Sequence, residues 1–205
     1  MIYLNKKEIN KVASLFNDNK LIAFPTETVY GLGIIATSNE NFNRLVEVKH
    51  RSPNKPFTLM ISNILQVKDI IEINDLAKKI LELFTPGPLT LILKTKKDVP
   101  HFLDLGTGFI GIRIPNDQFI LDVINIVNKP LLVPSANPSD LPPATNKEEV
   151  YNYFKENIDY IVEGDIKSNI PSTIIKVDGN EITLIREGEL KFNKIKEKLY
   201  ENSIR

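Results

Sequence analysis

The segment that decides the fold is LIAFPTETVYGLGII, which occupies residues 21–35. It begins with an apolar run at residues 21–24 that the following proline stops, and this pattern predicts a short buried strand. From Gly31 the segment also satisfies the G-x-G-x-x-A pattern of dinucleotide-binding proteins. That fingerprint requires a helix to open at the glycines, but residues 34 and 35 continue as strand and the next helical pattern starts near Asn39. A Rossmann-type nucleotide site is therefore excluded here.

Helical and strand patterns alternate along the rest of the chain. Helical spacing of apolar residues occurs around positions 9–16, 42–46, 76–84, 119–127 and 150–154, and strand-like runs occur at 57–61, 89–93, 110–114 and 131–133. Two further runs, 174–177 and 182–185, flank an Asp-Gly pair that predicts an antiparallel hairpin. Strands separated by helices favour crossover connections. We therefore expect an α/β fold with a twisted, open, mixed β-sheet flanked by helices.

The chain is expected to form a single domain over residues 1–205. This length slightly exceeds that of a typical domain, and no internal repeat or low-complexity linker divides it. Phe192, Ile195 and Leu199 recur at helical spacing among lysines and glutamates. This pattern predicts a C-terminal amphipathic helix over about residues 191–202, with its charges in solvent.

Composition excludes several classes of protein. Lysine and arginine (26) balance aspartate and glutamate (26), so any site for an anion requires a local basic cluster. The absence of cysteine excludes disulfides, thiolate nucleophiles and cysteine-ligated metal sites, and two histidines nearly exclude a multi-histidine metal centre. The apolar runs are too short for a membrane span, and the first residues lack the pattern of a signal peptide. We expect a cytoplasmic protein.

Cationic side chains lie next to several predicted elements. Lys49, Arg51 and Lys55 follow a helix in a loop with two prolines, where they suit phosphate or carboxylate but equally suit capping of the helix C-terminus. Arg113 lies in an apolar strand, so its guanidinium needs an anionic partner from the protein or from a ligand. Arg186 ends the hairpin beside a glutamate, and a surface ion pair is the alternative explanation.

Short polar side chains follow the strands at three more places. Ser135 and Asn137 come after the run 131–133, and Ser172 opens the hairpin, at strand ends where open α/β sheets usually bind ligands. Thr28 precedes the two glycines of the opening segment, where short hydroxyl side chains suit the close approach of a ligand. Each stretch could equally form only a turn or a cap.

Taken in order, these motifs resemble the YrdC-like (TsaC) family of threonylcarbamoyl-AMP synthases. The resemblance is carried by PTETVYGL (25–32), K-x-R (49–51) with Lys55-Pro56, PGPLT (86–90), G-x-R-x-P (111–115), SAN (135–137), PST (171–173) and Arg186. These seven ordered motifs span about residues 21–188. The sequence departs from the family at Asp140, where relatives have glycine, and at Phe109 and Met60, where they often carry threonine and histidine.

The resemblance implies a twisted open sheet with a large, positively lined cavity. It also implies a nucleotidyltransferase that forms threonylcarbamoyl-AMP and pyrophosphate from L-threonine, bicarbonate or carbon dioxide, and ATP, so that other proteins can modify an adenosine of tRNA. The residues that this interpretation assigns are Lys49 and Arg51 to catalysis, Arg51, Lys55, Ser135, Asn137 and Arg186 to ATP, and Thr28, Arg113 and Ser172 to threonine.

Cofactors and partners follow from the same resemblance. Mg²⁺ would enter on the ATP phosphates, because no carboxylate cluster indicates a dedicated metal site, and no prosthetic group is implied. The expected partners are downstream tRNA-modifying proteins, with at most weak direct contact to tRNA and none to a membrane. Two alternatives stay open: an RNA- or nucleotide-binding module without turnover, and a carbamoyl-adenylate domain like that of hydrogenase-maturation carbamoyltransferases.

Overall fold

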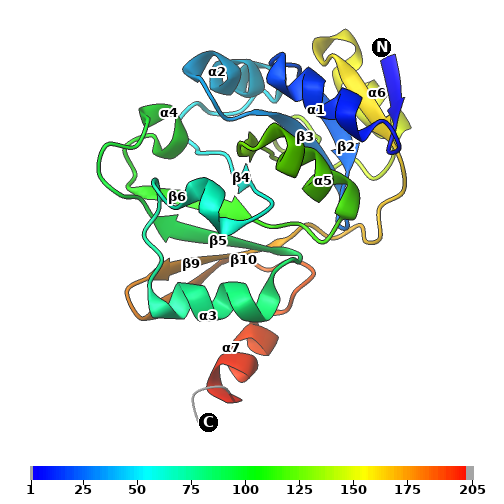
Figure 1. Cartoon of the computed structure of the whole chain (residues 1–205). Coiled ribbons are helices and arrows are strands. Elements are labelled where there is room, and N and C mark those ends of the chain that lie inside the picture. The colour runs from blue at the N-terminus through cyan, green and yellow to red at the C-terminus, as the bar shows by residue number, and fades with distance from the viewer. Residues whose placement is uncertain (1, 202–205) are drawn as a thin grey trace.

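Ten strands form one open sheet in the computed structural model, which describes residues 2–201 (Figure 1). The strands are β1 (Ile2–Asn5), β2 (Ile22–Pro25), β3 (Tyr30–Ile35), β4 (Leu59–Met60), β5 (Leu89–Lys94), β6 (Phe109–Arg113), β7 (Leu131–Leu132), β8 (Tyr160–Glu163), β9 (Thr173–Asp178) and β10 (Glu181–Arg186). Their order across the sheet is β1-β8-β2-β3-β7-β4-β6-β5-β9-β10. The pairs β1/β8, β2/β8, β4/β6 and β5/β9 are parallel and the others are antiparallel, so the predicted mixed sheet is confirmed.

The structure describes seven helices, four of which begin at a capping side chain. They are α1 (Ile9–Asn17), α2 (Asn39–Val48), α3 (Asp75–Phe84), α4 (His101–Asp104), α5 (Gln118–Val127), α6 (Lys147–Phe154) and α7 (Phe192–Glu201), with single 3₁₀ turns η1 (Ile64–Val67) and η2 (Lys155–Asn157). Ser38, Asn74, Asp117 and Asn146 each accept a hydrogen bond from the backbone amide three residues later, which fixes the starts of α2, α3, α5 and α6. The predicted C-terminal helix is confirmed as α7, and position 202 lies outside the described residues.

The two faces of the sheet are covered unequally. On one face α1 and α5 contribute Phe16 and Val123 to a core with Phe24 of β2. On the other face α2, α3, α6 and α7 pack against all of the longer strands, with Ile80 of α3 as one example. Within the described chain, no residue of β5, β6, β9 or β10 belongs to the α1/α5 core. Helices α1 and α5 therefore leave this face uncovered at β5, β6, β9 and β10.

Side-chain alternation determines what this uncovered part of the sheet presents. In β5, Leu89, Leu91 and Leu93 join the core under α3, so Thr90 points to the opposite face. In β6, Ile110 and Ile112 likewise point to the α3 side and leave Arg113 on the other side. Polar side chains from neighbouring strands thus gather on one face of the sheet.

Some predicted boundaries were wrong or incomplete. The run 57–61 shortens to β4 and 131–133 to β7, because these two strands pair with each other over only two residues each. β1 and β8 were not predicted. β3 includes Gly31 and Gly33 and ends at Ile35, and α2 begins only at Asn39. No helix opens at the glycines, so the exclusion of a Rossmann-type site is confirmed. Among the helices of residues 2–201, none combines the length and apolarity needed to cross a membrane.

Candidate functional site

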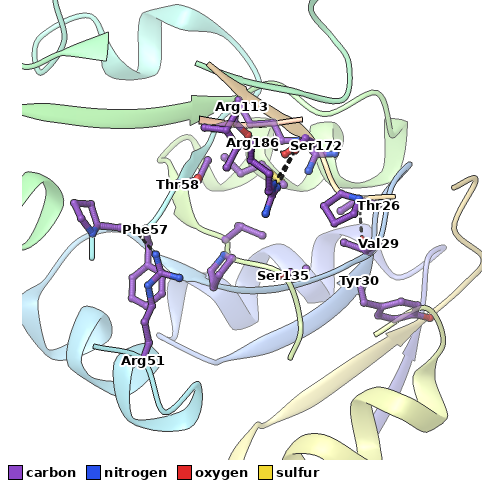
Figure 2. A pocket seen from close by; sticks show the side chains of 18 residues that line it. Thr26, Val29, Tyr30, Arg51, Phe57, Thr58, Arg113, Ser135, Ser172 and Arg186 are labelled. Carbon is purple, nitrogen blue, oxygen red and sulfur yellow. Dashed lines mark hydrogen bonds between the residues drawn. The ribbon is translucent and has the colours of Figure 1, made fainter. Parts of the chain in front are cut away.

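A cavity of about 170 Å³ lies on the uncovered face of the sheet (Figure 2). Its lining consists of Thr26, Val29, Tyr30, Gly31, Arg51, Pro56, Phe57, Thr58, Met60, Thr90, Arg113, Val133, Pro134, Ser135, Pro171, Ser172, Ile174 and Arg186. The sheet order brings these segments together. Because β5 pairs with β9, Thr90 and Ser172 meet with their hydroxyl oxygens 3.0 Å apart. The lining includes five residues that the sequence predicted: Arg51, Arg113, Ser135, Ser172 and Arg186.

 In all, five of the nine predicted site residues line the cavity, and Thr28, Lys49, Lys55 and Asn137 do not.

Three guanidinium groups reach the cavity from three different elements. Arg113 comes from the end of β6, Arg186 from the end of β10 and Arg51 from the loop after α2. In Figure 2, Arg113 and Arg186 lie together on one side and Arg51 lies on the opposite side. Burial lowers the pKa of Arg51 and of Arg186, and the charge of Arg113 lowers that of Arg186 further. No carboxylate is among the described lining residues, so the cavity favours an anionic ligand.

Arg113 has an anionic partner within the protein. Its Nη2 donates to Glu27 Oε1 at 2.8 Å and to Thr28 Oγ1 at 2.9 Å. The side chains of the ion pair are only 9% and 7% exposed, so the two charges are shielded from solvent. Arg113 Nε and Glu27 Oε2 are buried and have no hydrogen-bond partner among the described residues. The sequence left an ion pair and a cavity position as alternatives for Arg113, and the structure contains both.

Thr28 lies behind Arg113 and not in the cavity wall. It is fully buried, and its hydroxyl oxygen is also 3.0 Å from that of Thr26. Thr26 donates to the carbonyl of Val29 at 2.8 Å and itself lines the cavity. The geometry therefore indicates that Thr28 orients the guanidinium, whereas Thr26, which was not predicted, is the threonine of this motif that lines the cavity.

Arg186 and Ser172 form one wall of the cavity. Arg186 donates to the Ser172 carbonyl from Nη2 at 2.8 Å and from Nε at 3.3 Å, a contact drawn in Figure 2. Gly188 follows closely, and its amide donates to Thr173 Oγ1 at 2.9 Å. A Cβ at Gly188 would lie 2.1 Å from the Pro171 carbonyl oxygen. Only glycine permits this approach of the two backbones.

Arg51 and Lys55 separate in space although they share a loop. The guanidinium carbon of Arg51 lies 5.0 Å from the centre of the Phe57 ring, and Nη2 donates to the Pro56 carbonyl at 3.2 Å. These contacts hold the charge at the cavity wall. Lys55 is exposed and does not line the cavity. Its carbonyl accepts a hydrogen bond from Arg51 Nε at 3.3 Å.

Lys49 is buried beneath the loop that carries Ser135. It is only 2% exposed, and its Nζ donates to the carbonyls of Ser135 at 2.6 Å and Asn137 at 2.5 Å. Burial lowers the pKa of Lys49 to about 7, and the charge of Arg51 acts in the same direction. Asn137 accepts from Ser135 Oγ at 2.6 Å and donates to the Leu141 carbonyl at 2.6 Å. Lys49 and Asn137 thus shape this loop from within, and Ser135 alone of the three reaches the cavity.

The three departures from the family pattern occupy different places. Met60 lines the cavity. Phe109 does not, and its ring lies 3.6 Å below the ammonium of Lys176. Asp140 has a φ of +68°, so it adopts the left-handed conformation that glycine would adopt most easily. The loop around Asp140 therefore keeps a glycine-type backbone without the glycine.

Several lining residues were missed by the sequence analysis. Thr58 and Thr90 lie on predicted strands, and their side chains occupy positions opposite to the core-facing leucines. A polar residue at a core-opposed position of a buried strand is the signal that could have identified them. No group of three or more His, Asp or Glu side chains suitable for a metal ion occurs in the part of the chain that the structure describes.

Comparisons with known proteins agree on one family. The Sua5/YciO/YrdC family model, described as "Telomere recombination", matches residues 14–188. A putative threonylcarbamoyl-AMP synthase of Methanocaldococcus jannaschii is 34% identical over 94% of this chain and 93% of its own length. The threonylcarbamoyl-AMP synthase of Bacillus subtilis is 33% identical over 90% of this chain, which spans 54% of that relative.

Solved structures give the same result. The crystal structure of Pyrococcus abyssi Sua5 complexed with L-threonine superposes with a TM-score of 0.90 at 31% identity. It covers 96% of this chain, which in turn spans 60% of the Sua5 chain. The structure of Escherichia coli YciO has a TM-score of 0.82 at 22% identity and shares the fold.

Proposed function

Because the chain belongs to the Sua5/YciO/YrdC family, we propose that it is a nucleotidyltransferase that forms threonylcarbamoyl-AMP. Its substrates would be L-threonine, bicarbonate or carbon dioxide, and ATP, and its second product would be pyrophosphate. The observation that carries this proposal is the convergence of Arg51, Arg113 and Arg186 on one cavity without a lining carboxylate. Such a site suits a ligand with several anionic groups, as a triphosphate and an amino acid carboxylate together provide.

The proposed reaction needs no covalent intermediate with the protein. The ammonium group of threonine loses one proton to become an amine, which attacks carbon dioxide and loses a second proton to form a carbamate. A carbamate oxygen then bonds to the α-phosphorus of ATP, and the bond from that phosphorus to the bridging oxygen breaks to release pyrophosphate. Reactions of this type depend mainly on positioning of the reactants and on neutralisation of developing charge.

The contacts divide the proposed roles among the side chains. Arg51 and Arg186 would face the phosphates, because both lie at the cavity wall and neither has a carboxylate partner among the described residues. Arg113 would bind the carboxylate of threonine, beside the hydroxyl of Ser172. Ser135 would contact the nucleotide. Lys49, Asn137 and Thr28 would support these groups from behind, since none of them lines the cavity.

Mg²⁺ would arrive bound to ATP as part of the substrate. The cavity offers hydroxyl groups and guanidinium groups but no carboxylate cage, so a metal would keep phosphate and water ligands. We also propose that the product serves tRNA modification by downstream proteins in the cytoplasm. The balanced charge of the chain, 26 cationic against 26 acidic residues, supports weak rather than strong direct contact with tRNA.

The test is release of pyrophosphate from Mg-ATP by the purified chain. We expect release only when L-threonine and bicarbonate are both present, with threonylcarbamoyl-AMP found by mass spectrometry. Equal release when either is omitted would refute the proposal. Binding of ATP without any turnover would support the nucleotide-binding module instead, and turnover with carbamoyl phosphate in place of threonine and bicarbonate would support the carbamoyl-adenylate alternative.

A further inference from the structure

Tyr30 connects three segments around the cavity. Its backbone amide donates to the Ala144 carbonyl at 3.0 Å, and its carbonyl accepts from the Ala136 amide at 2.7 Å. Its hydroxyl donates to the Gly164 carbonyl at 2.7 Å, across 134 positions of sequence. Tyr30 is 1% exposed, and the hydrogen bond to the exposed Gly164 is partly buried. In Figure 2 the ring of Tyr30 points away from the three arginines.

Gly164 begins the connection between β8 and β9, and we call residues 164–171 of this connection the rim. The rim has no helix or strand, and most of it is exposed. Between positions 165 and 169, no hydrogen bond joins it to another part of the described chain. At its far end Pro171 lines the cavity and accepts from the Glu189 amide at 3.0 Å. Hydrogen bonds therefore hold both ends of the rim, and between them the partly buried Ile166 packs against the core.

The start of the rim has few attachments besides the phenol. A Cβ at Gly164 would lie 2.8 Å from the side chain of Lys6 and 3.0 Å from the ring of Pro25, so these two groups only pack against it. Burial raises the pKa of Tyr30 to about 12. The hydroxyl thus remains a donor at any ordinary pH.

We propose that Tyr30 is a positioning residue for the proposed reaction, because its hydroxyl holds the start of the rim and so keeps Pro171 and Ser172 in place. This inference rests on the proposed function. It assigns the Tyr30 hydroxyl to the rim. Ser172 directly follows Pro171, the last residue of the rim, and its hydroxyl lies beside the proposed threonine site. We therefore expect loss of the Tyr30 hydrogen bond to weaken threonine binding more than it slows the chemical step.

The test compares Tyr30→Phe with the wild type and with Tyr160→Phe. Tyr160 lies on β8, four residues before the rim, and its hydroxyl makes no hydrogen bond within the described chain. Trypsin can cut the folded protein in the rim after Lys167, and after Lys97 in a distant exposed loop, so one digest contains both the test and its reference. Initial rates of the two cuts are measured by mass spectrometry, and KM and kcat are measured by pyrophosphate release.

Loss of one buried hydrogen bond in Tyr30→Phe should speed the cut after Lys167 about three- to tenfold, with the cut after Lys97 unchanged. The KM for threonine should rise by a similar factor, while kcat and the KM for ATP stay within about twofold. Tyr160→Phe should match the wild type.

Equal rates of cutting in the rim, equal acceleration at both sites, or faster cutting without a change in the KM for threonine would each overturn the proposal. A wild-type chain that releases no pyrophosphate would refute the proposed function and with it the effect on KM. The digest would then still decide whether Tyr30 holds the rim.

Discussion

The two cationic regions of the cavity are built in opposite ways. In the loop after α2, Lys49, Arg51 and Lys55 are close in sequence but separate in space: the first is buried, the second lines the cavity and the third lies in solvent. Arg113 and Arg186 are far apart in sequence but meet at one wall, because β5 and β9 place the ends of β6 and β10 near each other. The order of strands in the sheet therefore indicates better than proximity in sequence which cations share one site.

The two regions also hold their charges differently. Arg113 is fixed by a buried carboxylate and a buried hydroxyl. Arg51 is held by an aromatic ring and by backbone carbonyls, so its charge has no counterion within the protein. Removal of the carboxylate that pairs with Arg113 should therefore destabilise the fold. Removal of the Arg51 guanidinium should instead lower activity.

The largest effect is expected from Glu27→Ala. This change leaves the buried Arg113 guanidinium without its counterion and should lower the free energy of unfolding by ~3 to 5 kcal/mol. Glu72→Ala is the control, because the Lys94–Glu72 pair is exposed and 3.7 Å apart and should contribute at most ~1 kcal/mol. Urea unfolding measures both variants. A loss below ~1 kcal/mol for Glu27→Ala would show that Arg113 does not depend on this partner.

The next effect concerns the loop after α2. Arg51→Ala should slow pyrophosphate release roughly a hundredfold, about 3 kcal/mol of transition-state stabilisation, with the fold preserved. Lys55→Ala, in the same loop, should stay within about twofold of the wild type, because its side chain is exposed. Steady-state kinetics and thermal melts compare the two variants. Similar losses of rate in both would mean that the loop acts as one cationic cluster after all.

The smallest effect is a dependence of stability on pH that comes from Lys49. Its pKa is about 7 in the fold, against an ordinary value of 10.5. Between these values the unfolded chain binds a proton that folded Lys49 has lost, so the contribution of Lys49 to the free energy of unfolding rises with pH, by about 1 kcal/mol per unit. Below about pH 7 both states are protonated and this slope vanishes.

Urea unfolding at several pH values from about 6 to 9 measures this slope. Lys49→Met should lack it, whereas Lys55→Met should keep it, since Lys49 is then intact. If the wild type and Lys49→Met changed in parallel over this range, the ammonium of Lys49 would have to remain charged in the fold, held by the carbonyls of Ser135 and Asn137.

Much of the fold could be predicted from periodicity, and the failures have a common cause. The helices α3 and α5 and the strands β5 and β6 carry long apolar patterns, so their type follows from the sequence. β1 has four residues, of which Ile2 and Tyr3 are exposed, and no alternation marks it. β1 is a strand because it pairs with β8, and that pairing depends on the tertiary fold.

The sequence predicts which residue types form the site, but not which side chains contact each other there. A lone arginine in an apolar strand demands a partner, yet nothing in the spacing identifies Glu27, because β7 and β4 separate β3 from β6 in the sheet. Lys49 and Arg51 carry similar sequence signals. Their different positions follow from the direction in which the chain leaves α2, which places Lys49 beneath the 135–137 loop.

The position of the β9–β10 hairpin determines when the site can exist during synthesis. Chains emerge from the ribosome with the N-terminus first, and β9 and β10 follow the other described strands in sequence. Until β9 emerges, the side of β5 that will pair with it is an open sheet edge, and such edges can pair with other chains. The hairpin is thus translated after the other described strands, and it both completes the cavity wall and closes the exposed edge. A nascent chain stalled before this point would carry an aggregation-prone strand and no complete site.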